Sequence, residues 1–139
     1  MSDERFILKN ARHLAARYME EILRPGDIAV DATMGNGKDT QFLCELVGET
    51  GRVYAFDVQE TALASTAEHL EKSGCPRNYT LILDSHHNVK KYVTAPIRAG
   101  MFNLGYLPGS DKHITTMRVT TMPAIEAAID LLDHGVQYL

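Results

Sequence analysis

Acidic side chains end three short apolar runs of this sequence. Asp31 follows the run 27–30, Asp57 ends the run 52–57, and Asp84 ends the run 79–84. Each run is rich in β-branched, aliphatic or aromatic residues and is bounded by turn-forming residues, which is typical of a buried strand. Because parallel strands present their carboxyl ends at one edge of a sheet, these carboxylates are expected to contribute to one site.

A glycine turn follows the first of these carboxylates. Gly35 and Gly37 separate Asp31 from a segment, 39–47, whose apolar residues have helical spacing. A strand, a glycine turn and a helix in that order expose backbone N–H groups and a helix N-terminus, which is where open α/β sheets bind nucleotides and related ligands. A tight strand-to-helix turn without a ligand is the alternative interpretation.

The spacing of the turn indicates which ligand to expect. A dinucleotide fingerprint needs a third glycine where Thr40 stands, and the lysine-containing P-loop pattern is absent. An acid at the end of the strand suits a positively charged ligand better than a pyrophosphate. S-adenosylmethionine, which carries a sulfonium and an ammonium group, fits this description.

The second and third carboxylates extend the predicted site. Asp57 lies about 20 residues beyond the last glycine, where α/β nucleotide sites place the carboxylate that binds the ribose hydroxyls. A cap for the following helix is the alternative. After Asp84, either Ser85 or His86 could border an adenine, or both could be ordinary loop polarity. A metal site at His86 and His87 is not expected, because adjacent helical residues diverge and no third ligand is near.

Length and composition limit the class of protein. The 139 residues are 45% apolar and carry a net charge of −4, which predicts one soluble domain and no general attraction to nucleic acid, so RNA would need a local basic patch. Cys44 and Cys75 have no metal-site spacing and are expected to be reduced thiols. No signal peptide or membrane-spanning run is apparent, so we expect a cytoplasmic location.

Strands and helices are predicted to alternate along the chain. We expect helices at 6–23, 39–47, 61–72 and 117–132, a short helix from 85 to 93, strands at 27–30, 52–57 and 79–84, and a fourth strand that ends at 101–104. The helix 61–72 is expected to bury Leu63, Ala64, Ala67 and Leu70. The pattern predicts an α/β fold with a mostly parallel sheet.

Two segments, 31–40 and 102–109, carry a resemblance to a known family. They resemble the class I S-adenosylmethionine-dependent methyltransferases and, more narrowly, the YtqB-type family of small bacterial rRNA methylases, over essentially the whole chain. The resemblance implies a Rossmann-like sheet with helices on both faces. It also implies methylation of the aminomethyl group of 5-aminomethyl-2-thiouridine at the tRNA wobble position. Ser110 departs from the family, which commonly has a glycine there.

The site residues follow from the strand ends together with this resemblance. Residues around the first three strand ends are expected to hold the methyl donor: Asp31, Thr33, Gly35, Asn36, Gly37, Asp39, Thr40, Asp57, Gln59, Ser85 and His86. Asn103 and the Leu104 backbone would offer carbonyl oxygens that orient the acceptor amine, and Tyr106 would stack on the base or face the sulfonium. Lys112, His113 and Arg118 would meet RNA phosphates, with Lys90 and Lys91 as a weaker patch; these side chains could equally be solvated surface.

The end of the sequence raises one further expectation. Class I methyltransferase sheets have seven strands, whereas only four are counted here, and 135–139 could at most begin a fifth. We therefore expect the C-terminal strands of the fold to be missing, with the fourth strand exposed as an edge that favours a homodimer. An rRNA base or a small-molecule amine is an alternative acceptor, and a non-catalytic binding or interaction domain is an alternative of another class.

Overall fold

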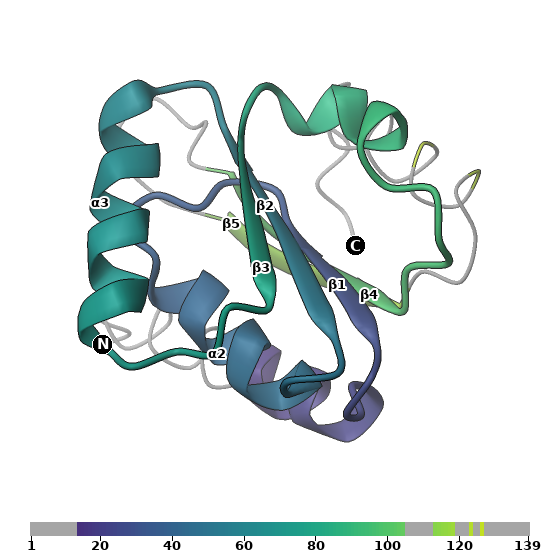
Figure 1. Ribbon diagram of the computed structural model, residues 1–139. Coiled ribbons are helices and arrows are strands. Elements are labelled where there is room, and N and C mark those ends of the chain that lie inside the picture. Colours follow the sequence, from purple (N-terminus) through teal and green to yellow (C-terminus); the bar gives the residue numbers. More distant parts are fainter. Residues whose placement is uncertain (1–13, 105–112, 119–122, 124–125, 127–139) are drawn as a thin grey trace, which may run out of the picture.

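Figure 1 shows the computed structural model, which describes residues 14–104, 113–118, 123 and 126, as a twisted sheet with helices packed against it. Residues 14–22 are helical and precede the first strand. The elements that follow are β1 (Ile28–Asp31), α2 (Lys38–Val47), β2 (Arg52–Asp57), α3 (Glu60–Lys72), β3 (Tyr79–Leu83), the 3-10 helix η1 (His86–Lys91), β4 (Ala99–Leu104) and β5 (His113–Arg118). Up to β4, these bounds agree with the predicted elements to within a few residues.

The strand order β3-β2-β1-β4-β5 creates a switch point beside β1. The chain runs outward from β1 through β2 to β3, then returns to place β4 on the other side of β1, and all these pairs are parallel. Among the described strands, only β5 is antiparallel, against β4. The carboxyl ends of β1 to β4 therefore lie at one edge, where open α/β sheets bind ligands. The predicted mostly parallel α/β sheet is confirmed.

Helical segments cover both faces of the sheet, as predicted. On one face, Leu43 and Val47 of α2 pack with buried residues of the helix 14–22 against Ala29 and Val53. The opposite face is covered by Val89 of η1 and by Val93 and Ile97, which pack on Val30, Phe56 and Ile82. Burial on both faces explains why the strands are continuous apolar runs and lack polar alternation.

Helix α3 buries a stripe that overlaps the predicted one only in part: Leu70 is buried as predicted and Leu63 is partly buried. Its buried residues are Ala62, Thr66 and Leu70, one helical turn apart, whereas Ala64 is exposed. The prediction placed Ala64 inside because it weighed apolar character alone. The small Thr66 side chain takes the central inward position, where α3 lies closest to the glycine turn.

Strand β5 corrects two predictions about the end of the chain. It pairs with β4 from Ala99↔Arg118 to Leu104↔His113, so the β4 edge is covered by 113–118, and the exposed edge predicted there is wrong. The helix predicted from Met117 starts too early, because Met117 and Arg118 complete β5; Pro123 and Glu126 are helical. Residues 135–139 lie outside the described residues. None of the described helices is long and apolar enough to cross a membrane.

Candidate functional site

Asp31 ends β1 as a fully buried carboxyl group. Thr40 Oγ1 donates a hydrogen bond to its Oδ2 at 2.7 Å, and the Thr33 N–H donates to Oδ1 at 3.3 Å. Burial raises the pKa of Asp31 to about 8, and the hydrogen bond from Thr40 only partly offsets this rise. Asp31 therefore ties the end of β1 to the first turn of α2, and in this conformation solvent does not reach it.

The glycine turn is closed on one side and open on the other. Gly35 and Gly37 both have left-handed backbones, with φ of +55° and +92°. A Cβ atom on Gly37 would lie 3.1 Å from Thr66 Cα, whereas a Cβ atom on Gly35 would meet nothing within 4 Å. The turn therefore packs against α3 at Gly37 and leaves open space beside Gly35, next to the N-terminus of α2.

Asp57 joins the end of β2 to this turn. Its Oδ2 accepts a hydrogen bond from the Gly35 N–H at 3.2 Å, and its Oδ1 accepts from the Gln59 N–H at 3.1 Å. Gln59, and not Asp57, is the N-cap residue of α3, and Asp57 accepts from the N–H of Gln59 itself, so the capping alternative does not describe Asp57. Each carboxylate oxygen keeps a second lone pair, and two lone pairs on neighbouring oxygens suit the two hydroxyls of a ribose. Val58, which follows, is 68% exposed.

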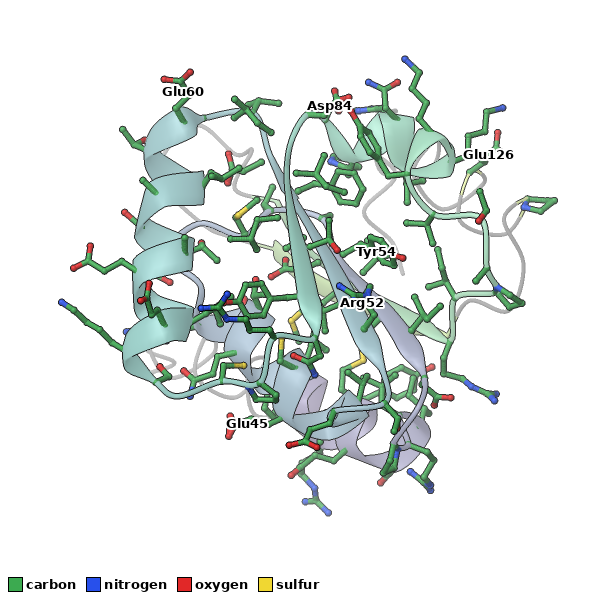
Figure 2. The ribbon with its side chains drawn as sticks, in the orientation of Figure 1. Glu45, Arg52, Tyr54, Glu60, Asp84 and Glu126 are labelled. Atoms are coloured by element: carbon green, nitrogen blue, oxygen red, sulfur yellow. The ribbon has the colours of Figure 1, made fainter. Side chains whose placement is uncertain are left out.

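Asp84 lies beside Asp57, through an isolated bridge between their backbones. It accepts hydrogen bonds from the Ser85 N–H at 2.7 Å, from Asn88 Nδ2 at 2.8 Å and from the Tyr92 hydroxyl at 2.7 Å. These donors, the Tyr92 hydroxyl foremost, hold the pKa of Asp84 below its usual value. Figure 2 shows Asp84 and Glu60, the first residue of α3, at the same end of the sheet.

The segment after Asp84 carries the residues predicted to meet an adenine. Ser85 is partly exposed, and its hydroxyl lies 2.5 Å from His87 Nδ1. His86 is buried and stacks on the His87 ring with centroids 4.5 Å apart. Ser85 is therefore more accessible to a ligand than His86.

The three carboxylates share an electrostatic character. In the part of the chain that the structure describes, none of the ion pairs involves Asp31, Asp57 or Asp84. Their hydrogen-bond donors are neutral hydroxyl, amide and backbone groups. Asp31, whose pKa of about 8 keeps it protonated at neutral pH, adds no charge, so Asp57 and Asp84 give this edge the negative potential that suits a cationic ligand. No group of three potential metal ligands forms among the same residues.

The remaining predicted residues divide between the two ends of the sheet. Asn103 and Leu104 end β4, which lies next to β1 through the pair Asp31↔Met101. His113 is paired with Leu104, whereas Arg118 is paired with Ala99 at the other end of β4. His113 thus reaches the same edge as the carboxylates, and Arg118 does not.

Three of the remaining predicted residues lie in the described part of the chain. Asn36 Oδ1 accepts a hydrogen bond from the Lys38 N–H at 3.4 Å, and Asp39 lies in the first turn of α2. Lys90 forms an exposed ion pair with Glu126 at 3.6 Å. Tyr106 and Lys112 lie outside the described residues.

Two further residues support this edge of the sheet and were not predicted from the sequence. Tyr92 bonds to Asp84 from eight residues away, a spacing with no sequence signature. Thr66, which lies on α3, donates a hydrogen bond to the Gly35 carbonyl at 3.2 Å. A polar residue at the centre of an apolar helical stripe was the available signal for Thr66.

Comparisons with known proteins show which family the chain resembles. Residues 53–138 match the family model described as "Putative rRNA methylase". A chloroplastic tRNA (mnm(5)s(2)U34)-methyltransferase of Arabidopsis thaliana is 36% identical over 91% of this chain and 50% of its own length. The chain spans about half the length of the curated relatives it matches.

Solved structures give the same result. An rRNA methylase of Streptococcus thermophilus is 48% identical, with a TM-score of 0.63 over 69% of this chain and 55% of that one. A "putative methyltransferase" of Streptococcus mutans, solved in complex with S-adenosylhomocysteine, is 45% identical, with a TM-score of 0.65 over 88% of this chain and 65% of that one. A protein-L-isoaspartate O-methyltransferase, at 13% identity and a TM-score of 0.58 over 78% of this chain and 41% of that one, shares the fold. The chain therefore belongs to the rRNA methylase family of S-adenosylmethionine-dependent methyltransferases.

Proposed function

We propose that this chain transfers a methyl group from S-adenosylmethionine to an amine on RNA, namely the aminomethyl group of 5-aminomethyl-2-thiouridine at the tRNA wobble position. The observation that carries the proposal is the set of carboxylates at the adjacent ends of β1, β2 and β3 around one glycine turn. The name of the Arabidopsis relative supports the choice of acceptor.

The residues present fit the methyl donor. When bound, S-adenosylmethionine supplies a methyl group activated by the positive charge on sulfur. Asp57 would accept hydrogen bonds from the ribose hydroxyls through the lone pairs that Gly35 and Gln59 leave available. Asp84 and Ser85 would border the adenine. Asp31, buried behind the turn, would act through Thr40 as a positioning residue that fixes the start of α2 beside the donor.

The acceptor would approach from the end of β4. The Asn103 side-chain carbonyl and the Leu104 backbone carbonyl would accept the amine hydrogens, which turns the nitrogen lone pair toward the methyl group. Tyr106 would stack on the base. Lys112 and His113 would contact RNA phosphates near this edge, whereas Arg118 would contact only RNA that extends along β5.

The test measures donor binding and methyl transfer separately. Calorimetry with S-adenosylhomocysteine reports the donor site, and no binding would favour an interaction domain. Methyl transfer is then assayed on tRNA that carries 5-aminomethyl-2-thiouridine, on rRNA and on a free alkylamine. We expect activity on the tRNA. Activity on rRNA alone would support the alternative that the family description favours.

Asn103→Ala tests the orienting role in the same assay. We expect it to lower kcat/KM about 100-fold without changing affinity for S-adenosylhomocysteine, because orientation of the amine affects only the transfer step. Asn103→Gln is the matched control: it keeps the amide but moves it by one methylene group, so most of the activity should still be lost. Unchanged turnover by Asn103→Ala would remove this role.

A homodimer is part of the proposal. Because β5 covers β4, the edge strands of the described sheet are β3 and β5, and pairing between two copies would use one of these edges. Sedimentation velocity at high concentration tests this expectation, and a clean monomer would contradict it.

A further inference from the structure

Helix α3 holds the glycine turn more tightly than a simple packing contact would require. The buried Thr66 hydroxyl donates to the Gly35 carbonyl at 3.2 Å. A Cβ atom on Gly37 would come within 3.1 Å of Thr66 Cα and 3.4 Å of His69 Cβ, so only glycine allows this approach. One helical turn further along α3, His69 Nε2 lies 2.6 Å from Gln41 Oε1 of α2. The glycine turn and the start of α2 are thus both fixed to α3.

Both peptide groups around Gly35 have a fixed direction as a result. Asp57 accepts from the Gly35 N–H, and Thr66 donates to the Gly35 carbonyl. In a trans peptide the carbonyl and the following N–H point in opposite directions. Because the Gly35 carbonyl points to α3, the Asn36 N–H must point away from α3.

The Asn36 N–H is available to a ligand. Gly35 and Asn36 are both exposed, and space beside Gly35 is open. Within residues 14–104, no acceptor within hydrogen-bonding distance is found for the Asn36 N–H. An N–H group that is fixed in direction and has no internal partner at a helix N-terminus can bind an anionic oxygen.

We propose that Thr66 is a positioning residue of the donor site, whose hydroxyl fixes the Gly35–Asn36 peptide so that the Asn36 N–H donates to the carboxylate of the donor's amino-acid moiety. Thr66 itself does not touch the donor. This inference rests on the proposed function, because it requires the donor to lie beside the turn.

The test compares two ligands and two variants. S-adenosylhomocysteine carries the amino-acid carboxylate, whereas 5′-methylthioadenosine shares the adenosine and lacks it. Thr66→Val removes the hydroxyl and keeps the shape, and Thr66→Ser restores the hydroxyl. We expect Thr66→Val to weaken S-adenosylhomocysteine about 5- to 10-fold by calorimetry, the effect of one lost hydrogen bond. Affinity for 5′-methylthioadenosine should stay unchanged, and Thr66→Ser should bind like the wild type.

A second readout needs no ligand. In the ligand-free protein, Thr66→Val should change the NMR shift of the Asn36 amide, and Thr66→Ser should reverse the change. Equal losses for the two ligands would show a general structural role and overturn the inference. If Thr66→Val does not fold, Thr66→Ala compared with Thr66→Ser makes the same test. Wild-type protein that fails to bind S-adenosylhomocysteine would overturn the proposed function together with this inference, whereas unchanged binding by Thr66→Val would overturn this inference alone.

Discussion

The two ends of the sheet differ in the partners of their charged side chains. At the amino end, Asp27 accepts from the Arg24 N–H at 2.9 Å and pairs with Arg98 at 3.6 Å, and Arg52 donates to the Thr80 hydroxyl at 3.0 Å. In Figure 2, Arg52 lies well away from Asp84, which marks the carboxyl end. At that other end, the described residues give the carboxylates neutral donors only.

The amino end of the sheet also has a cavity, but the charges around it are balanced. A hollow of about 370 Å³ lies at the amino end, lined by residues 26–28 and 96–98. Its charged groups, Asp27 and Arg98, already balance each other. The amino end thus combines a cavity with balanced charge, whereas the carboxyl end combines a glycine turn with carboxylates that have no cationic partner among the described residues, and the proposed donor site is at the carboxyl end.

Asp31→Asn should produce the largest change, in the pH dependence of the free energy of unfolding. Because the folded pKa of about 8 lies above the ordinary value of 3.8, the folded chain keeps a proton that the unfolded chain loses as the pH rises between these values. The contribution of Asp31 to stability is therefore fully present below pH 4 and lost by about pH 8. We expect Asp31→Asn to remove this loss, on the order of 5 kcal/mol across the interval. Urea unfolding of both proteins from pH 4 to pH 9 measures the difference.

Asp84→Asn is the control of opposite sign. The lowered pKa of Asp84 means that its contribution is present above its ordinary pKa and lost as the pH falls. The difference in the free energy of unfolding between Asp84→Asn and the wild type should therefore change with pH only below the ordinary pKa of an aspartate. A difference for Asp31→Asn that does not vary with pH would contradict the burial argument.

Gly37→Ala should have the next largest effect. The substitution adds left-handed strain and a contact of 3.1 Å with the Thr66 backbone, so we expect a loss of roughly 3 kcal/mol in the free energy of unfolding. Gly74→Ala is the matched control, because Gly74 has φ of +68° and open space around it. It should lose only about 1 kcal/mol. Equal losses of the free energy of unfolding, measured in urea, would show that the close contact with α3 adds no cost at Gly37.

Asp57→Asn compared with Asp27→Asn tests the two ends of the sheet directly. The first variant should weaken S-adenosylhomocysteine about 100-fold, because two charge-assisted hydrogen bonds to the ribose are lost. The second makes the same chemical change at the amino end and should leave the affinity within about 2-fold. Calorimetry with S-adenosylhomocysteine measures the affinity of both variants. Similar losses of affinity would contradict the placement of the donor site at the carboxyl end.

Arg98→Met should have the smallest effect. The Arg98 side chain is 41% exposed and 3.6 Å from Asp27, so the pair is expected to contribute less than about 1 kcal/mol. Thermal unfolding at low and high salt measures the contribution, and donor binding should not change. A loss of several kcal/mol would mean that the amino-end charges are structural supports.

The first two-thirds of the fold could be predicted because its signals are local. Glycines at positions 35, 37, 48 and 51 mark the ends of β1, α2 and β2, and the apolar runs between them are long enough to distinguish strand from helix. Asp57 and Asp84 could be located for the same reason, since each directly follows or ends such a run. Their roles toward the donor stay predictions.

The parts that were missed depend on contacts between distant segments. Residues 113–118 pair with β4 as a strand; the β-branched run 114–116 was the available local signal, and its partner strand could not be read from it. The inward position of Thr66 depends on the approach of α3 to Gly37. The burial of Asp31 depends on packing around α2, which no sequence window contains.

The antiparallel pairing of β4 with β5 has one more consequence. Leu104 and His113 face each other, so the intervening segment leaves and rejoins the sheet at the same point. Residues 105–112 could therefore be lengthened, shortened or exchanged without altering the spacing of any strand. Such a change would leave the ends of β1, β2 and β3, and the donor site proposed there, unaltered.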